Sequence, residues 1–455
     1  MNYPLYLRRY CHLLIILVFT FNIVVLSLKS CSQREWCGQD IDQYKDYSDS
    51  LLLGKGFSAS KVVNMYFVDP KPGVLYVPEI LRLPGYSVLI SAGRLFYDSP
   101  KIVIYFNILF YLFVLYFSFH LAKRLSLGRL SYAVLVVVGI NPTLIFYTAI
   151  LPSVDIFTAF CLTGFVYFFL GLDGARSYIP QRLIVVTLLA IMAIFTRQNT
   201  LLIVFGLIVA LVFWKYVRKE KLNLSWYIFI LVASIMSVLA WSARNYFITG
   251  YFGMTFYEGN QLFSEHIYFT PYPNKDSIGL STWAFGHWGA KDIIDERLNM
   301  GESIPQAYAF YNKFMYLLTL DHIVKYPQKT SGHFATAVKD FFLVYPFPGE
   351  KNILILFLKG LFDFINKLFI LGLALTPLLL LFKRTAANRY LLFSLWFLVL
   401  LFTLLSSFFH GVVVGNRGVL PVVSLLTLFL VVCLQSLGGL VALFAGKARR
   451  EIQRK

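Results

Sequence analysis

The chain has few charged residues and few cysteines, and these shortages exclude several classes of protein. Only 14% of its 455 residues are Asp, Glu, Lys or Arg, whereas 58% are hydrophobic, and the mean hydropathy is +0.67. A water-soluble protein of this length needs more charge to cover its surface. The five cysteines show no spacing typical of a zinc site, and the sequence contains no internal repeat. This composition indicates an integral membrane protein.

Long apolar runs are what the sequence has in abundance. Several reach about 18 residues, which an α-helix needs to cross the ~30 Å hydrocarbon layer. They do not alternate as strands of a membrane β-barrel do, so we expect an all-α, polytopic transmembrane helical bundle. About ten spans are predicted, at residues 10–28, 101–121, 131–150, 153–171, 183–196, 199–215, 226–243, 361–382, 390–409 and 418–445. The runs 183–196 and 199–215 could equally be one helix broken between them.

Lys and Arg are distributed unevenly over the predicted loops, and this sets the orientation. The basic loops are expected in the cytoplasm together with both termini. The first run follows Arg8 and Arg9 and is interpreted as a retained span rather than a cleaved signal peptide. The formal net charge of +18 therefore reflects membrane topology and does not indicate a nucleic-acid partner. Since no Asn-x-Ser/Thr lies on the opposite side, we expect a bacterial inner membrane, with the active face toward the periplasm. The basic loops carry Lys123, Arg124, Arg129, Arg176, Arg182, Lys215, Arg218, Lys219, Lys221, Lys383, Arg384, Arg389, Lys447, Arg449 and Arg450.

Two segments on the exoplasmic side, about 29–100 and about 244–360, are too long to be turns. The predicted organisation is accordingly an N-terminal transmembrane module with the first loop, an exoplasmic or periplasmic loop region with amphipathic helices, and a C-terminal transmembrane module. Their boundaries are 1–246, 247–360 and 361–455. Within the middle region, Pro305 to Gln328 is expected to form an amphipathic helix on the membrane surface. Whether Cys31 and Cys37 of the first loop form a disulfide stays open.

Acidic residues occur at the outer ends of the spans, where a charge near hydrocarbon is costly and by default suggests a function. Asp40 and Asp42 lie two residues apart in the first loop. One carboxylate suits a general base and two suit a divalent metal, but a solvated acidic loop has the same pattern. Asp155 follows Pro152-Ser153, where a carboxylate also complements the positive end of a helix dipole.

Four arginines lie on this same side, where positive charge is otherwise avoided. One of them precedes the turn Pro84-Gly85-Tyr86, and arginine is suited to bidentate phosphate binding. Together they predict a shared anionic ligand such as a lipid phosphate. The alternative is that each is an independent interfacial anchor. The four are Arg82, Arg197, Arg244 and Arg417.

Taken in order, these residues resemble a known family. The first-loop pattern resembles that of the GT-C glycosyltransferases, in the branch of the protein O-mannosyltransferases and the lipid A aminoarabinose transferase. That pattern is Asp40-x-x-x-Tyr44, Ser48-x-x-Leu51-Leu52-x-Gly54-x-Gly56-Phe57 and Arg82-x-Pro84-Gly85-Tyr86. The resemblance covers residues from about 30 to 445. Its further matches are Asn141-Pro142, Tyr147, Ser153-x-Asp155-x-Phe157, Thr196-Arg197, Trp241-x-x-Arg244-Asn245-Tyr246 and Asn416-Arg417-x-x-x-Pro421.

The resemblance implies a glycosyltransferase that moves a sugar from a polyprenyl-phosphate-linked donor to a lipid, glycan or protein acceptor at the exoplasmic face. It implies that Asp40 is the catalytic base, that Arg82 holds the donor phosphate and that Asp155 lines the same cavity as a second catalytic candidate. The remaining substrate-binding candidates are Asp42, Tyr44, Tyr86, Arg197, Arg244 and Arg417. No cofactor or metal ligand is assigned, and a divalent metal stays an open alternative.

This chain departs from the aminoarabinose branch at two positions. That branch has Lys where this chain has Arg82, and Arg where it has Gln43. The departures argue against an aminoarabinose donor and a lipid A acceptor. Two other functions were weighed: a polymerase or ligase of lipid-linked glycans, which leaves the pattern from Asp40 to Tyr86 unexplained, and a transporter of lipid-linked sugars. Transporters tend to show internal symmetry and charges near the bilayer midplane, and this sequence shows neither.

The catalytic assignment predicts that Asp40→Asn abolishes sugar transfer, because the amide cannot accept the acceptor proton. The variant should still insert and bind the lipid donor. The measurement is transfer by purified protein with a lipid-phosphate-linked sugar. Full activity would refute the role of Asp40 as base.

Overall fold

The computed structural model describes residues 5–30, 41–60, 76–99, 101–150, 153–172, 179–197, 200–217, 224–256, 262, 290–343, 353–381, parts of 392–404 and 422–452. Helices dominate these ranges, with one short antiparallel pair of strands. In order, the elements are α1 (Leu5–Ser30), α2 (Ile41–Leu52), β1 (Ser58–Ala59), β2 (Val77–Pro78), α3 (Gly85–Arg94), α4 (Lys101–Arg124), α5 (Leu130–Gly139), α6 (Pro142–Ile145), the π-helix η2 (Phe146–Ile150), α7 (Val154–Phe169), α8 (Ile179–Ile194), α9 (Thr200–Val217), α10 (Leu224–Thr249), α13 (Ala290–Asn299), α14 (Ile304–Lys325), α15 (Pro327–Leu343), α16 (Ile353–Leu381) and α18 (Val423–Ile452).

The predicted helical membrane bundle is confirmed. Four described helices contain a segment long and apolar enough to cross a membrane, in α1, α4, α10 and α16, and a fifth does if a bent pair counts as one span. Shorter apolar helices cover 154–169, 180–194, 200–209 and 423–437. Each predicted span overlaps described helical residues, and the span 390–409 lies partly outside the described residues. The regions 183–196 and 199–215 form two separate helices, α8 and α9.

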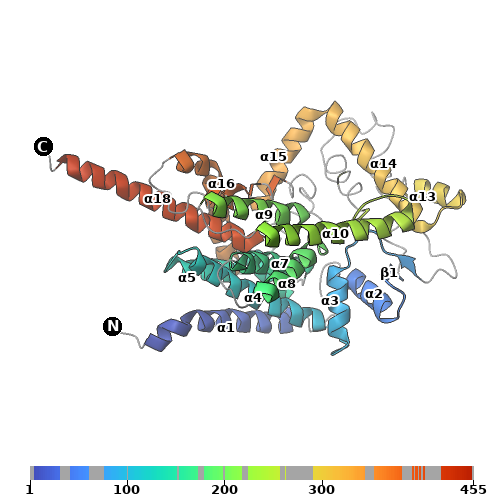
Figure 1. Cartoon of the computed structure of the whole chain (residues 1–455), viewed down its shortest axis with the longest axis horizontal. Helices are drawn as coiled ribbons and strands as arrows, with labels where there is room; N and C mark the ends of the chain where they lie inside the picture. Colours follow the sequence, from blue (N-terminus) through green and yellow to red (C-terminus); the bar gives the residue numbers. More distant parts are fainter. Residues whose placement is uncertain are drawn as a thin grey trace.

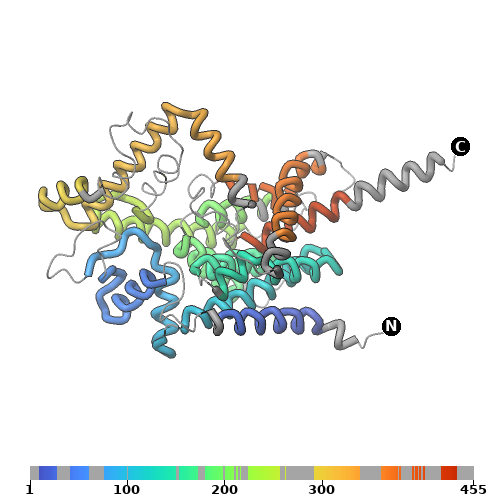
Figure 2. The backbone as a smooth tube through the Cα atoms, turned by 180° about the vertical axis from the view of Figure 1, so that it is seen from behind, coloured from blue at the N-terminus to red at the C-terminus, as the bar shows by residue number. Residues whose placement is uncertain are grey.

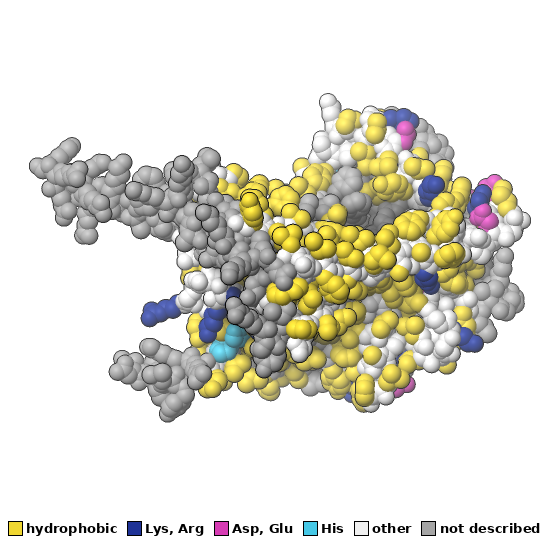
Figure 3. Space-filling model, viewed as in Figure 1, with side chains coloured by type: hydrophobic (Ala, Val, Ile, Leu, Met, Phe, Trp, Pro, Cys, Tyr) yellow, Lys and Arg dark blue, Asp and Glu magenta, His cyan; other side chains and the backbone are white. Residues whose placement is uncertain are grey.

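The long helices run along one axis of the molecule, and the remaining elements gather at one end of it. In Figure 1, α1, α10 and α18 lie roughly along the long axis, while α3 runs across that axis beside α2. The elements α2, α13 and α14 lie at the end opposite to the start of α1 and the end of α18, as Figure 2 shows from behind. On the face that Figure 3 shows, hydrophobic side chains cover much of the described surface between the two ends, as expected for a lipid-facing surface.

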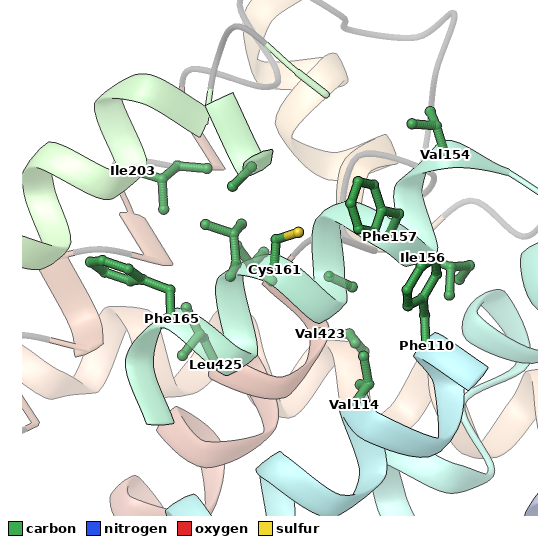
Figure 4. Packing of buried hydrophobic residues seen from close by; sticks show 14 of the residues in the cluster. Phe110, Val114, Val154, Ile156, Phe157, Cys161, Phe165, Ile203, Val423 and Leu425 are labelled. Carbon is green, nitrogen blue, oxygen red and sulfur yellow. The ribbon is translucent and has the colours of Figure 1, made fainter. Parts of the chain in front are cut away.

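The centre of the bundle is packed with apolar side chains from helices far apart in the sequence. Phe110 and Val114 of α4, Phe157 and Phe165 of α7, and Val423 of α18 are buried there (Figure 4). Because lipid is as apolar as these side chains, close packing and polar contacts hold such helices together. One such contact joins α4 to α18.

That contact is a hydrogen bond from the Ser118 hydroxyl to the Ser424 hydroxyl, with the oxygens 2.8 Å apart. Both side chains are buried.

A bent span carries the chain from α5 to the start of α7. The helices α5 and α6 meet at 48°, where Pro142 begins α6 and the Asn141 side chain accepts a hydrogen bond from the Leu144 N–H at 3.0 Å. A π-helix follows, a form found frequently at functional sites. The Ser153 N–H donates to the Tyr147 carbonyl at 3.1 Å, so the bend sets where α7 begins.

The expected helix at Pro305 to Gln328 is present as α14, and α15 follows after one residue. Tyr308, Tyr311 and Met315 form its buried face, whereas Phe314 and Leu317 are exposed. Its placement on the membrane surface and the boundaries 1–246, 247–360 and 361–455 stay predictions.

The turn before α3 packs directly on the end of α8. The Gly85 N–H donates to the Phe195 carbonyl at 2.9 Å. A Cβ at Gly85 would lie 2.7 Å from that carbonyl oxygen, closer than real Cβ contacts. Glycine is therefore required here by the close approach of two backbones.

We predict that Gly85→Ala destabilises the protein by about 1–3 kcal/mol, the usual cost of an added methyl group in a tightly packed site. Thermal denaturation in detergent measures the change. Gly332→Ala in α15 is the matched control, since a Cβ there meets open space and alanine favours the helix. Equal effects of the two substitutions would contradict the packing argument.

Candidate functional site

Two of the predicted site residues, Asp40 and Arg417, lie outside the described residues, as do Cys31 and Cys37. Their roles stay predictions. The other candidates lie on α2, between β2 and α3, on α3, at the start of α7, just after α8, and on α10. All of them except Asp42 form two groups, which are described in turn.

The first group is built around an ion pair between Asp155 and Arg197. The Asp155 side chain is fully buried and that of Arg197 is 13% exposed. The Ser153 hydroxyl donates to Asp155 Oδ2 at 2.6 Å and accepts from the Asp155 N–H at 3.3 Å. A buried carboxylate is tolerated only when paired and hydrogen-bonded, and these contacts meet that requirement. Two residues predicted separately therefore form one unit.

Tyr44 and Tyr86 belong to the same group. Their rings meet edge to face with centroids 5.3 Å apart, and the Tyr86 ring lies 6.0 Å from that of Phe157. The Tyr86 hydroxyl donates to Asn107 Oδ1 at 3.1 Å. Burial, with Tyr44 and Asp155 nearby, raises the pKa of Tyr86 well above its usual value, so the phenol stays a neutral donor.

Asn107 connects the two halves of this group. While its oxygen accepts from Tyr86, its Nδ2 donates to the Ser153 carbonyl at 3.3 Å. Asn107 is fully buried in α4. The sequence reasoning missed it, although one amide side chain within an apolar span was a usable signal. Polar contacts thus join α3, α4, the start of α7 and the residue Arg197 after α8, and the Tyr44 ring of α2 packs against this network.

The second group contains Arg82 and Arg244, with a carboxyl group between them that the sequence reasoning also missed. Arg82 is half-buried, and its Nε donates to Gln43 Oε1 of α2 at 3.2 Å. Its N–H donates to Glu79 Oε1 at 2.8 Å. Glu79 is fully buried and stands in the apolar run Val77-Pro78-Glu79-Ile80-Leu81. That lone charge among apolar residues was the available signal.

Arg244 contacts the first loop through two backbone carbonyls. Its Nη1 donates to the Glu79 carbonyl at 2.7 Å and its Nη2 to the Phe57 carbonyl at 3.1 Å. The guanidinium also lies over the Trp241 ring, 4.6 Å from its centroid. These contacts join α10 to the strand pair β1–β2, and a contact of Arg244 with a ligand stays a prediction.

Asp42 lies on the exposed face of α2, so it is not brought into either group. Among the residues that the structure describes, no cluster of three His, Cys, Asp or Glu side chains could hold a metal ion.

Comparison of the sequence with protein-family models and with curated proteins finds no match. Among solved structures, the chain is similar to the archaeal oligosaccharyltransferase AglB from Archaeoglobus fulgidus, in complex with an inhibitory peptide and a dolichol-phosphate. The TM-score is 0.54 at 11% identity, over 98% of this chain and 52% of that chain. ArnT from Cupriavidus metallidurans matches in the apo state and bound to undecaprenyl phosphate, with TM-scores of 0.38. The identities are 12% and 13%, over 92% and 93% of this chain and 77% of that chain in both cases.

The similarity to AglB supports the expected fold, a polytopic bundle of membrane helices. At 11% identity it shows the fold alone. The chain spans about half the length of the AglB chain that it matches.

We predict that Arg197→Ala destabilises the protein by about 3–5 kcal/mol, because it leaves the buried Asp155 carboxylate uncompensated. The double variant Asp155→Ala/Arg197→Ala should lose less than the sum of the single losses. Thermal denaturation in detergent is the measurement. Asp321→Ala breaks the exposed pair with Lys325 and is the control, with a loss of at most about 1 kcal/mol. Additive single losses would show that the pair is not coupled.

Proposed function

We propose that this integral membrane protein is a GT-C-type glycosyltransferase. It moves a sugar from a polyprenyl-phosphate-linked donor to a lipid, glycan or protein acceptor at the exoplasmic face. The observation that carries the proposal is that one polar network joins Tyr86, Asp155 and Arg197, with the Tyr44 ring packed against Tyr86. These four residues span more than 150 positions of the sequence, and the sequence names each of them as a candidate for the site.

The proposed reaction is a displacement at the anomeric carbon of the sugar. The bond from that carbon to the carrier phosphate oxygen breaks, and a bond to the acceptor hydroxyl oxygen forms. The acceptor proton passes to Asp40, and the carrier leaves as polyprenyl phosphate. Because the acceptor attacks opposite to the leaving group, the anomeric configuration inverts.

Negative charge grows on the phosphate as it leaves, and cationic donors held in place stabilise such charge. Arg82 is the proposed donor, since its backbone is fixed by Glu79 and its guanidinium by Gln43. The proposed role of Asp155 is to hold Arg197 beside the network and to line the sugar cavity. AglB, whose fold this chain shares, was solved with a dolichol-phosphate, which supports a polyprenyl phosphate as the carrier.

The proposed location is a bacterial inner membrane, with the site toward the periplasm and both termini in the cytoplasm. The basic loops support this orientation. Mass spectrometry of surface lipids and glycans from cells lacking the protein tests the function directly. Loss of one sugar from one acceptor is expected, and an unchanged glycan profile would contradict it.

For Arg82→Ala we predict an increase of about 10- to 100-fold in the KM for the lipid donor, because one charge-assisted contact to the phosphate is lost. The KM for the acceptor should change little. The measurement is steady-state transfer by purified protein.

Arg297→Ala is the matched control for this variant. Arg297 lies in α13, pairs with Glu302 and belongs to neither group of site residues. An unchanged donor KM in Arg82→Ala, or an equal rise in the control, would refute the phosphate role of Arg82.

A further inference from the structure

Glu79 occupies a position that neither the fold nor the proposed reaction chemistry explains by itself. It follows β2 and precedes Arg82 by three residues. Its Oε1 accepts from the N–H groups of Leu81 at 2.5 Å and Arg82 at 2.8 Å. The side chain folds back over its own turn and stabilises the backbone on which Arg82 stands.

The main chain of Glu79 is fixed as firmly as its side chain. Its N–H donates to the Phe57 carbonyl at 3.0 Å, beside the β1–β2 pair of Ser58 with Pro78. Its carbonyl accepts from Arg244 Nη1, and Arg244 Nη2 reaches the same Phe57 carbonyl. Arg244 therefore stabilises both sides of the contact that places Glu79.

A buried carboxyl group is a costly way to stabilise a turn. Burial raises the pKa of Glu79 above its usual value, against the opposing effects of hydrogen bonds from the Arg82 backbone, Tyr47 and the Leu81 backbone. Turn backbones at the surface are ordinarily stabilised by Asn, Asp, Ser or Thr at much lower cost. The long side chain of Glu79 instead reaches the N–H of Arg82, the residue that the family resemblance implies as the phosphate ligand.

We propose that Glu79 is a positioning residue. Its carboxyl oxygen fixes the backbone of Arg82, and Arg244 supports Glu79 from α10, so that Arg82 meets the phosphate of a polyprenyl lipid in one orientation. This inference rests on the proposed function for its ligand, whereas the geometry of Glu79 can be tested without any ligand. In this proposal, Arg244 acts through Glu79 and does not contact the lipid itself.

The first experiment measures hydrogen exchange in peptides covering the backbone amides of Leu81 and Arg82, in purified full-length protein without substrate. Glu79→Ala removes the acceptor, and exchange at these amides should become about tenfold faster or more. Glu79→Gln keeps an acceptor oxygen at the same distance and should exchange like the wild type. Unchanged exchange in Glu79→Ala would overturn the proposed hold on Arg82.

The second experiment measures binding of undecaprenyl phosphate, with uncharged undecaprenol as the comparison lipid. Glu79→Ala should weaken the binding of undecaprenyl phosphate about tenfold and leave the binding of undecaprenol unchanged. Glu79→Gln should bind undecaprenyl phosphate as the wild type does. In an Arg82→Ala background, Glu79→Ala should add less than about twofold, because its effect passes through Arg82. Additive losses, as a merely structural role would give, would overturn the proposal.

Glu302→Ala serves as the control, because this carboxylate pairs with Arg297 away from both site groups; no change in lipid binding is expected. The two failures are distinguishable. If the wild-type protein binds undecaprenol with the same affinity as undecaprenyl phosphate, both the proposed function and the ligand of this inference are overturned. Unchanged exchange at Leu81 and Arg82 overturns the role of Glu79 alone.

Discussion

The ion pair of Asp155 with Arg197 is the interaction on which this end of the bundle depends. A charge close to hydrocarbon has to be paired, and its desolvation makes the geometry of the pair strict. Here the carboxylate begins α7 and the guanidinium follows α8, so the pair fixes two helices that pack along their lengths. The Ser153 hydroxyl fills a further acceptor position on Asp155. The end of each helix is thereby defined by a polar contact rather than by apolar packing alone.

From that pair, a chain of neutral contacts reaches the first loop. Asn107 donates a hydrogen bond to the Ser153 carbonyl and accepts one from the Tyr86 hydroxyl. The Tyr86 ring packs against the Tyr44 ring. Beside it, the Gly85 N–H bonds to the Phe195 carbonyl at the end of α8. A substitution in the first loop is therefore connected through short, mostly buried contacts to the ends of α4, α7 and α8. This explains why side chains from separate parts of the sequence act as one site in the proposed reaction.

Much of this arrangement could be predicted from the sequence, for identifiable reasons. Apolar runs indicate helical spans because a backbone in lipid must form its hydrogen bonds internally. Charges close to the hydrocarbon are easy to recognise in a sequence because they are rare there. Asp155 and Arg197 were selected in this way, whereas Arg82 was selected from its place before the turn Pro84-Gly85-Tyr86. The roles of all three stay predictions. Which charge pairs with which was not predictable, since α7 and α8 could have met in several rotations.

Glu79 and Asn107 were missed for the opposite reason. Each is a single polar residue within an apolar stretch, and its partners are backbone groups or neutral side chains that carry no pattern along the sequence.

The charge balance of the second group bears on the proposed ligand. Arg197 is matched by Asp155, while Arg82 and Arg244 both contact Glu79, through its carboxyl group and its carbonyl respectively. Burial raises the pKa of Glu79, and the hydrogen bonds from Arg82, Tyr47 and Leu81 oppose that rise. The hydrogen bond from the Arg82 N–H needs only an acceptor oxygen, which a carboxyl group supplies in either protonation state. In the proposed transfer, Glu79 therefore orients Arg82 through its backbone. The guanidinium of Arg82, whose Nε donates to Gln43, is the group that meets the phosphate.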